Sequence, residues 1–143
     1  MAFLDSLNIS GSALTAARLR MDIISQNIAN QNTTRTEAGG PYRRKMVVYQ
    51  AEEADFESML QNKIDKKVGG VKVAQIVEDQ TPFTPVYNPS HPDADENGYV
   101  YMPNVDPVQE VLDFMETTAM YNANLTALEA IKNMALKALE IGK

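Results

Sequence analysis

The residues best placed to do chemistry lie in the stretch PDADENGYV, positions 92–100. Asp93, Asp95 and Asn97 offer oxygen ligands at the alternating spacing of a calcium loop, and the next residue is the glycine such a loop needs for its turn. The twelfth position of that loop requires a bidentate Glu but holds Asn104 here, and nearby prolines oppose flanking helices. We therefore expect a tight Asn-Gly turn whose aspartates bond to backbone groups. A small secreted calcium-binding module is the alternative.

Catalytic sites built on histidine or cysteine have little support. The chain has one histidine and no cysteine, so it lacks a second imidazole and any thiolate. Ser90, His91 and Asp93 include the residue types of a hydrolytic triad, but triad members normally converge from distant segments. We expect no enzymatic activity, no cofactor, and no catalytic or metal-ligating residue.

Side-chain amides form the second group of candidates. Asn27, Asn30 and Asn32 end an N-terminal helical pattern, and Asn122 and Asn124 lie inside a C-terminal one. Asparagine favours helix ends, so Asn30 and Asn32 are expected to cap the first helix. An amide buried between helices fixes their register and choice of partner at some cost in stability. We expect the other three amides to have that role.

The first element that positions these amides is a helix from Phe3 to about Asn30. Apolar residues recur every seven positions at Leu7, Leu14, Met21 and Ile28, with a complementary seam at Phe3, Ser10, Ala17 and Ile24. Residues 1–30 carry only Asp5, Arg18, Arg20 and Asp22 as charged side chains. So few charges indicate a helix that other protein surfaces cover.

The second helix has a clear start. Asp106 can cap it, Pro107 takes the first helical position, and Gln109 falls where a capping-box partner belongs. We expect it to run nearly to Ile141, with Gly142 ending it. Its broad apolar stripe contains Val108, Val111, Leu112, Met115, Ala119, Leu125, Leu128, Ile131, Ala135 and Leu139.

Between the helices the sequence predicts a small β region. Residues 45–50 (KMVVYQ) and 71–77 (VKVAQIV) have the β-branched and aromatic content of strands. Residues 51–61 are ambiguous between strand and short helix. Residues 81–104 hold five prolines and must be extended and irregular.

The two helices are too long for a compact domain. At about 1.5 Å per residue they extend about 40 and about 50 Å, whereas a compact chain of this size is only about 37 Å across. We therefore expect related chains to cover the apolar faces that a helix pair leaves bare. The predicted fold is mainly α with a small β insert: long terminal helices pair as a coiled-coil-like bundle in a helical assembly, with a short β-hairpin or extended loop region between them. Its segments are an assembly helix (1–31), a loop with a β-containing insert (32–106) and a second assembly helix (107–143).

Composition excludes two classes of partner. The net charge of −6 argues against nucleic acid, since phosphate binding needs clustered Lys and Arg. No apolar run is long enough to cross a bilayer, so we expect no direct membrane insertion. The N-terminus lacks a basic region followed by an uninterrupted apolar core, so we expect no Sec signal peptide.

Several segments together resemble the flagellar rod and hook axial protein family. They are NIANQNT at 27–33, GGPYRRK at 39–45, HPDADENGYVYMPNVDPVQEV at 91–111 and MYNANLTALEAIKNMALKALEIGK at 120–143. The resemblance covers almost the whole chain and is weakest at 51–67. It implies a non-enzymatic structural subunit of the proximal rod of the bacterial flagellar basal body, which polymerises through its terminal helices into the driveshaft that carries motor torque to the distal rod and hook.

The same resemblance implies partners and a location. The partners would be further copies of this chain, other rod proteins such as FlgB, FlgF and FlgG, a rod-to-membrane-ring adaptor, and the flagellar type III export apparatus that delivers the chain to the periplasmic rod. The assembly interface is expected to contain Leu7, Leu14, Met21, Ile24, Asn27, Ile28, Asn30, Thr33, Tyr42, Val111, Met115, Tyr121, Asn122, Asn124, Leu125, Leu128 and Ile131.

Overall fold

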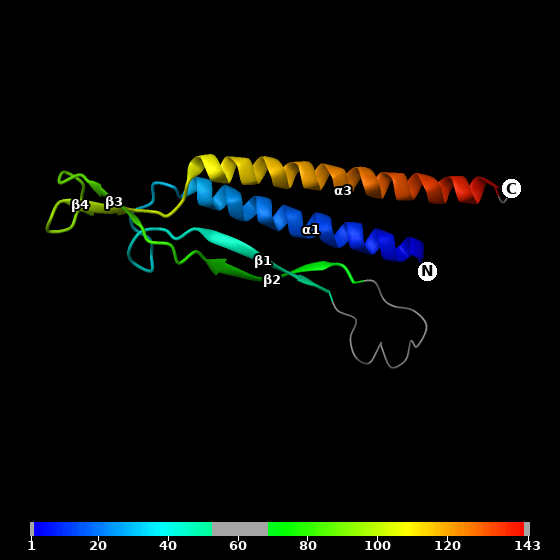
Figure 1. The fold of residues 1–143 in the computed structure, drawn as a ribbon, viewed down its shortest axis with the longest axis horizontal. Coiled ribbons are helices and arrows are strands. Elements are labelled where there is room, and N and C mark those ends of the chain that lie inside the picture. The colour runs from blue at the N-terminus through cyan, green and yellow to red at the C-terminus, as the bar shows by residue number, and fades with distance from the viewer. Residues whose placement is uncertain (1, 53–68, 142–143) are drawn as a thin grey trace, which may run out of the picture. The chain divides into compact units, whose positions relative to one another are not determined.

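The computed structural model describes residues 2–52 and 69–141. Along the chain lie α1 (Ala2–Ala29), β1 (Lys45–Ala51), β2 (Val71–Glu78), β3 (Thr84–Tyr87), β4 (Tyr99–Met102) and α3 (Pro107–Ile141) (Figure 1). Two long helices with a small β insert confirm the coarse fold prediction. Most of residues 51–61, whose structure was ambiguous from the sequence, lie outside the described residues.

Contacts within the chain gather into two units. The first unit contains Met1–Leu19, Val48–Gln75 and Thr117–Lys143; the second contains Arg20–Val47 and Ile76–Glu116. Each unit therefore draws on both helices and on the segment between them. The division at 31 and 106 expected from the sequence separates the assembly helices from the insert and does not concern contacts within one chain. It stays a prediction.

Helix α1 buries one of its two predicted seven-residue lines. Ser10, Ala17 and Ile24, which recur every seven residues, are buried. Leu7, Leu14, Met21 and Ile28 are only half-buried. At Ser10 and Ala17 the side chains on the buried line are small, which allows neighbouring atoms to approach the helix closely.

Of the two asparagines expected to cap α1, Asn30 bonds to the end of the helix. The Asn30 side-chain amide donates to the Gln26 carbonyl at 2.8 Å, at the C-terminal end of the helix. The Asn30 backbone N–H also donates to the Gln26 carbonyl, at 3.1 Å. Asn32 is exposed in the turn just beyond.

Helix α3 starts as predicted, with one correction. An Asp106 carboxylate oxygen accepts from the backbone N–H groups of Val108 and Gln109, at 2.9 and 3.4 Å, and so caps the helix. The capping-box role expected for Gln109 is wrong. Its side-chain amide donates instead to Asp113 at 3.2 Å, because that carboxylate lies one turn along the same helix face.

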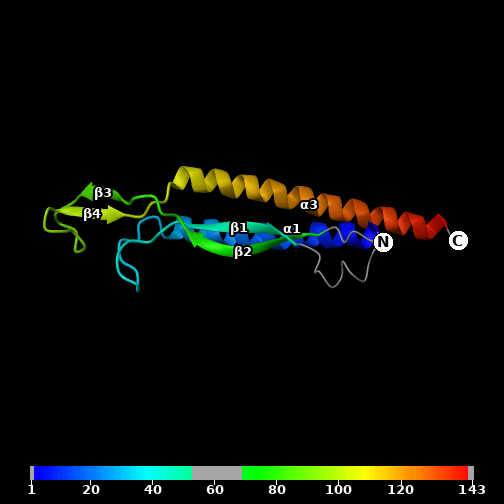
Figure 2. The same ribbon diagram turned by 60° about the horizontal axis from the view of Figure 1, so that its bottom comes forward.

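Strands β1 and β2 pair in a two-stranded sheet, confirming both predicted strands (Figure 2). Asp79 N–H donates to the Arg44 carbonyl beside one end of the pair, and Glu52 N–H donates to the Gly70 carbonyl at the other. The start of β1 therefore meets the end of β2, and the strands run antiparallel.

A second two-stranded sheet, β3 with β4, was not predicted. Residues 81–104 are extended as expected, but Thr84 to Tyr87 also pair antiparallel with Tyr99 to Met102. Pro85 obscured this strand because proline has no N–H to donate to a ladder. A two-stranded sheet tolerates it, since each strand has one open edge. Figure 2 shows this hairpin beyond the start of α3, in the second unit.

Candidate assembly site

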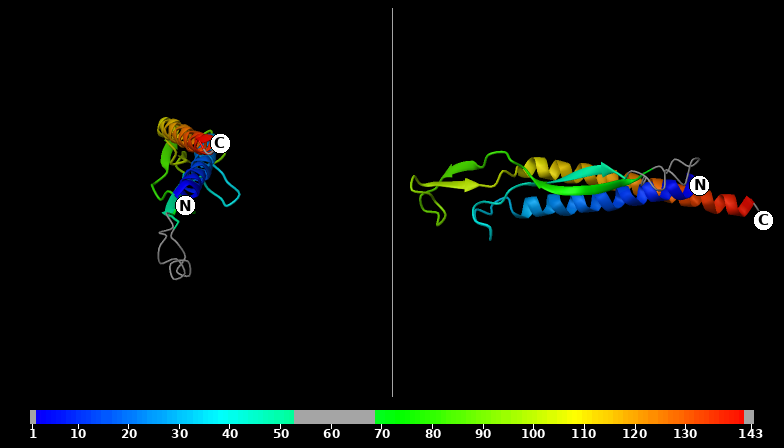
Figure 3. Two further views of the ribbon diagram at one scale, coloured as in Figure 1. Left: turned by 90° about the vertical axis from the view of Figure 1, so that its right-hand side faces the viewer. Right: turned by 90° about the horizontal axis from the view of Figure 1, so that it is seen from below.

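A buried polar cluster joins the last turns of α1 to the first turns of α3 in the second unit, where the two helix segments lie side by side (Figures 1 and 3). We call it the helix joint. Its members lie on α1, on the segment around the start of β1, on the segments flanking β3 and β4, and on α3. They are Asn27, Tyr42, Arg44, Lys45, Asp79, Asn104, Glu110 and Asp113.

Asn27 is the centre of the helix joint and is only 1% exposed. Its side-chain nitrogen donates to the Lys45 carbonyl at 2.9 Å and to Glu110 Oε2 at 3.0 Å. Its side-chain oxygen accepts from the Tyr42 hydroxyl and from the Lys45 N–H, both at 2.9 Å. These four bonds use both donors and both lone pairs of the amide. No apolar side chain of similar size could replace it without stranding all four partners.

Glu110 carries the charge of the helix joint and is 0% exposed. A buried carboxylate is costly unless it is paired and hydrogen-bonded. The Arg44 guanidinium pairs with Glu110 Oε1, and Asn27 covers Oε2. The same guanidinium reaches Asp113 at 3.1 Å and Asp79 at 3.9 Å. One arginine therefore holds three carboxylates that come from β2's end and from α3.

Backbone contacts fix Arg44 in this position. Its N–H donates to the Asn104 side-chain oxygen at 2.8 Å. The Asn104 amide nitrogen donates in turn to the Asp79 carbonyl and to the Thr81 hydroxyl, at 3.1 and 2.8 Å. Asn104 follows β4, and its side chain thus connects the end of the hairpin to the segment before β1 and to the segment after β2.

The electrostatics follow from these contacts. Burial, and next to it the charges of Glu110 and Glu78, raise the pKa of Tyr42 above its usual range. The pKa of Asp79 is lowered, chiefly by the hydrogen bond from the Thr81 backbone N–H and further by the Thr81 side chain and Arg44. The joint therefore favours the neutral form of Tyr42 and the ionised form of Asp79.

The predicted interface residues on α1 and the following loop fall into two groups. Ile24, Asn27 and Tyr42 are buried within the chain, and two of them belong to the helix joint. The others are half-buried: Leu7, Leu14, Met21, Ile28, Asn30 and Thr33.

Helix α3 shows the reverse of the usual amphipathic arrangement. Glu110 and Thr117 are its buried residues, and Asn124 and Ile131 continue the seven-residue spacing as half-buried positions. The opposite face of its first turns is apolar and 48–69% exposed. We call that face the apolar stripe: Val108, Val111, Leu112 and Met115. The spacing i, i+3, i+4 and i+7 places these four on one side of the helix.

The remaining predicted residues of α3 have mixed positions. Tyr121, Leu128 and Ile131 are half-buried, and Leu125 is exposed. Asn122 is exposed, and the Asn124 amide donates to the Met120 carbonyl of its own helix at 3.0 Å. A single chain therefore gives the two amides different environments, and their register role between chains stays a prediction.

The PDADENGYV stretch forms the predicted turn. Gly98 has a φ of +79°, and an Asp95 carboxylate oxygen accepts from the backbone N–H groups of Asn97 and Tyr99 at 2.9 and 2.8 Å. The backbone role expected for Asp93 is wrong: its carboxylate accepts from the Thr34 hydroxyl at 2.8 Å and lies 3.9 Å from Arg35. Thr34 is within reach because the loop after α1 packs against this turn.

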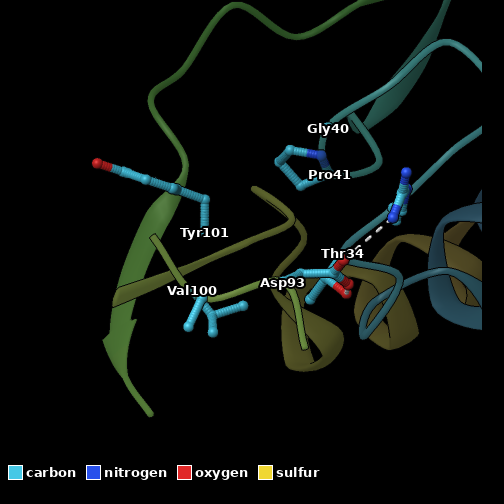
Figure 4. Close-up of a pocket in the computed structure, with 8 residues that line it drawn as sticks. Thr34, Gly40, Pro41, Asp93, Val100 and Tyr101 are labelled. Carbon is cyan, nitrogen blue, oxygen red and sulfur yellow. Dashed lines mark hydrogen bonds and ion pairs between the residues drawn. The ribbon is translucent and has the colours of Figure 1, made fainter. Parts of the chain in front are cut away.

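These contacts remove support for calcium binding. Figure 4 shows Thr34 and Asp93 at the wall of a small cavity of about 290 Å³, with the Tyr101 ring directed away from that pair. Within residues 2–52 and 69–141, no three His, Cys, Asp or Glu side chains converge on a point where a metal ion could bind. The Asp93 and Asp95 carboxylates of the loop are committed to loop and turn contacts.

Sequence reasoning missed the charged half of the helix joint. It did not select Arg44, Glu110, Asp113, Asp79 or Asn104 as candidate residues. One signal was available for Glu110, which precedes Thr117 and Asn124 at intervals of seven residues. That spacing places a carboxylate on the inner line of α3.

Comparison with known proteins connects this architecture to a family. Residues 7–35 match the family described as flagella basal body rod protein, and residues 96–141 match the family described as flagellar basal body rod FlgEFG protein C-terminal. Over full length, the chain is 49% identical to the flagellar basal-body rod protein FlgC of Bacillus subtilis (strain 168) and 41% identical to that of Salmonella typhimurium. It is 39% identical to FlgC of Borreliella burgdorferi over 99% of this chain and 98% of the relative.

Proposed function

Because the chain belongs to the FlgC family of flagellar basal-body rod proteins and is a structural subunit of the rod, we propose that it polymerises through its terminal helices in the proximal rod. There it would form part of the driveshaft that passes motor torque toward the distal rod and hook. A family of structural rod proteins is not a family of enzymes, and the chain needs no cofactor for this role.

The apolar stripe of α3 is the observation that carries the proposal. In a monomer, the exposure of Val108, Val111, Leu112 and Met115 to water is unfavourable in free energy, while the same helix buries Glu110 and Thr117. At about 25 cal/mol per Å² of apolar surface, covering four such side chains stabilises an assembly by several kcal/mol. A neighbouring subunit would provide that cover, and repeated head-to-tail contacts that do not close produce a helical filament.

The two groups of interface candidates would then have separate tasks. The exposed residues Val111, Met115, Asn122 and Leu125 would contact neighbouring subunits. The buried Ile24, Asn27 and Tyr42 would hold α1 and α3 in register within each subunit, so that they pair as a coiled-coil-like unit. A joint with one fully satisfied amide and one shared arginine would resist sliding of the helices past one another, which transmission of torque requires.

Other partners follow from the flagellar basal-body location of the family. The chain would contact other rod proteins such as FlgB, FlgF and FlgG and a rod-to-membrane-ring adaptor in the periplasm. It would reach them through the flagellar type III export apparatus. Among the residues that the structure describes, no helix is both long and apolar enough to span a bilayer.

Complementation of a strain lacking this gene tests the assembly role. Met115→Asp introduces a charge at the centre of the apolar stripe and should abolish rods and swimming, with subunits still exported. Glu129→Asp, on an exposed part of α3 and with its charge unchanged, is the matched control and should restore both. Basal bodies examined by electron microscopy give the result. Intact rods in the deletion strain itself would contradict the rod role, and intact rods with Met115→Asp would contradict the stripe as an interface.

A further inference from the structure

The β3–β4 hairpin presents three tyrosines on one face. Cross-strand partners in an antiparallel pair point to the same side, and the register pairs Pro85 with Tyr101 and Tyr87 with Tyr99. Alternation along each strand places all four on one face and directs Val100, which is 2% exposed, to the other. The tyrosines are 65%, 42% and 48% exposed for Tyr87, Tyr99 and Tyr101.

The aromatic face is preformed. The rings of Tyr87 and Tyr99 meet edge to face with their centroids 5.4 Å apart. Gly98 closes the hairpin loop beside them at a φ of +79°, and a Cβ there would lie 3.0 Å from the Tyr87 ring. Tyrosines that are already ordered lose little side-chain entropy when a partner covers them, which is why they are frequent at protein interfaces.

The hairpin and the sequence on both sides of it are acidic. From residue 73 to residue 131 the sequence has ten Asp and Glu residues and no Lys or Arg. Within that stretch, the hairpin loop carries Asp93, Asp95 and Glu96, of which Asp95 and Glu96 are exposed. Exposed tyrosines beside carboxylates suit guanidinium groups, which stack on aromatic rings and pair with carboxylates.

A second copy of this chain is a poor source of that positive charge. The chain carries a net charge of −6. Five of the thirteen basic residues of the chain lie in the second unit, and each of these five contacts an acid or an aromatic ring of its own chain, although the Arg35 side chain is 80% exposed. They are Arg20, Arg35, Arg43, Arg44 and Lys45. Two acidic surfaces of this kind would repel each other.

From the in-register tyrosines and the exposed Asp95 and Glu96 of the hairpin loop, we propose that the outer face of the β3–β4 hairpin (Pro85, Tyr87, Tyr99 and Tyr101) binds an arginine-containing basic surface of a different protein. The hairpin is separate from the apolar stripe, so this contact is additional to polymerisation through the helices. In the rod, the hairpin would therefore contact a different protein rather than another copy of this chain.

Site-specific photo-crosslinking in flagellated cells tests the proposal. A benzophenone amino acid replaces Tyr87 on the outer face or, as matched control, Thr84, which is exposed on the same strand but points to the other side. Electron microscopy first establishes that rods form in each strain, so failure of the rod role is recognised separately. The Tyr87 position should give a crosslink to a different protein at a segment rich in Arg or Lys, severalfold above the Thr84 position.

Charge reversal gives the second measurement. Glu96→Lys should lower the crosslinking yield at position 87 severalfold, whereas Glu96→Asp should leave it unchanged. A crosslink to another copy of this chain, a crosslink to an acidic or uncharged segment, or a yield no higher than at Thr84 would each overturn the proposal. So would an unchanged yield with Glu96→Lys in rods that assemble normally.

Discussion

Asn27→Leu tests whether the helix joint depends on one amide. Leucine branches at Cγ as asparagine does but can neither donate nor accept a hydrogen bond. The substitution strands the Tyr42 hydroxyl, both backbone groups of Lys45 and one oxygen of Glu110, all of which now bond to the Asn27 side chain. A single substitution therefore removes the hydrogen bonds that connect α1 to the segment from Tyr42 to Lys45 and to α3.

The magnitude follows from the count of bonds. Each of the four contributes about 1 kcal/mol net, and the one to the charged Glu110 contributes more. Leucine recovers part of the loss through its apolar burial, so the free energy of unfolding should fall by about 4 kcal/mol. For a domain of ordinary stability, about 5–15 kcal/mol, that loss is large. At about 2 kcal/mol per M of urea, the midpoint of unfolding should drop by about 2 M.

Urea unfolding of the purified chain, followed by far-ultraviolet circular dichroism, measures this shift. Amide hydrogen exchange at Lys45 reports the joint directly, because that N–H donates to the Asn27 side chain. Asn122→Leu makes the same chemical change at an exposed position of α3 and should alter the free energy by less than about 0.5 kcal/mol. Equal midpoints for the two variants, with unchanged exchange at Lys45, would refute the joint as the device that holds the helices together.

Three further substitutions probe other parts of the fold. Gly98→Ala places a Cβ 3.0 Å from the Tyr87 ring on a residue with a left-handed backbone conformation. The substitution should destabilise the hairpin by about 1–2 kcal/mol. Line broadening of the β3 and β4 amides in NMR spectra would report this loss. Asp106→Ala removes the cap of α3 and should cost about 1 kcal/mol in urea unfolding, whereas Asp106→Ser should cost far less. Asp79 has a pKa below its usual value of 3.8, so its contribution is complete above that value and is lost as the pH falls through the lowered one. Asp79→Asn should therefore flatten the acid side of the stability profile, and an unchanged profile would contradict the role assigned to the Thr81 and Arg44 contacts.

The helices and the first pair of strands could be predicted because local patterns determine them. A seven-residue apolar spacing and an Asp-Pro start are sufficient to place α1 and α3 to within a residue or two at the ends that the structure describes. The β3–β4 hairpin could not be predicted in the same way. Its pairing depends on the partner strand, and the proline in β3 argues locally against any strand.

The helix joint was only half predictable, for a physical reason. Asn27 interrupts an apolar pattern, and that is visible in the sequence. Its charged partners do not stand out, since Glu in the first turn of a helix and Arg beside a strand are usually solvated. Asn122 interrupts its own helix in a similar way yet is exposed in the single chain. The local sequence pattern cannot show which of the two amides is buried, because burial depends on residues far away along the chain.

The contact between Asn27 and Glu110 also constrains the order of folding. These residues are 83 positions apart, and closing a loop of that length costs about 4 kcal/mol of chain entropy beyond a constant term. Contacts of such long range form late compared with a helix turn or a hairpin. A chain that emerges from its N-terminus presents the Asn27 amide to water long before Glu110 exists to accept its hydrogen bond. The joint can therefore form only after the first turns of α3 have been synthesised and have packed against α1. Until then, the last turns of α1 and the first turns of α3 have no fixed register.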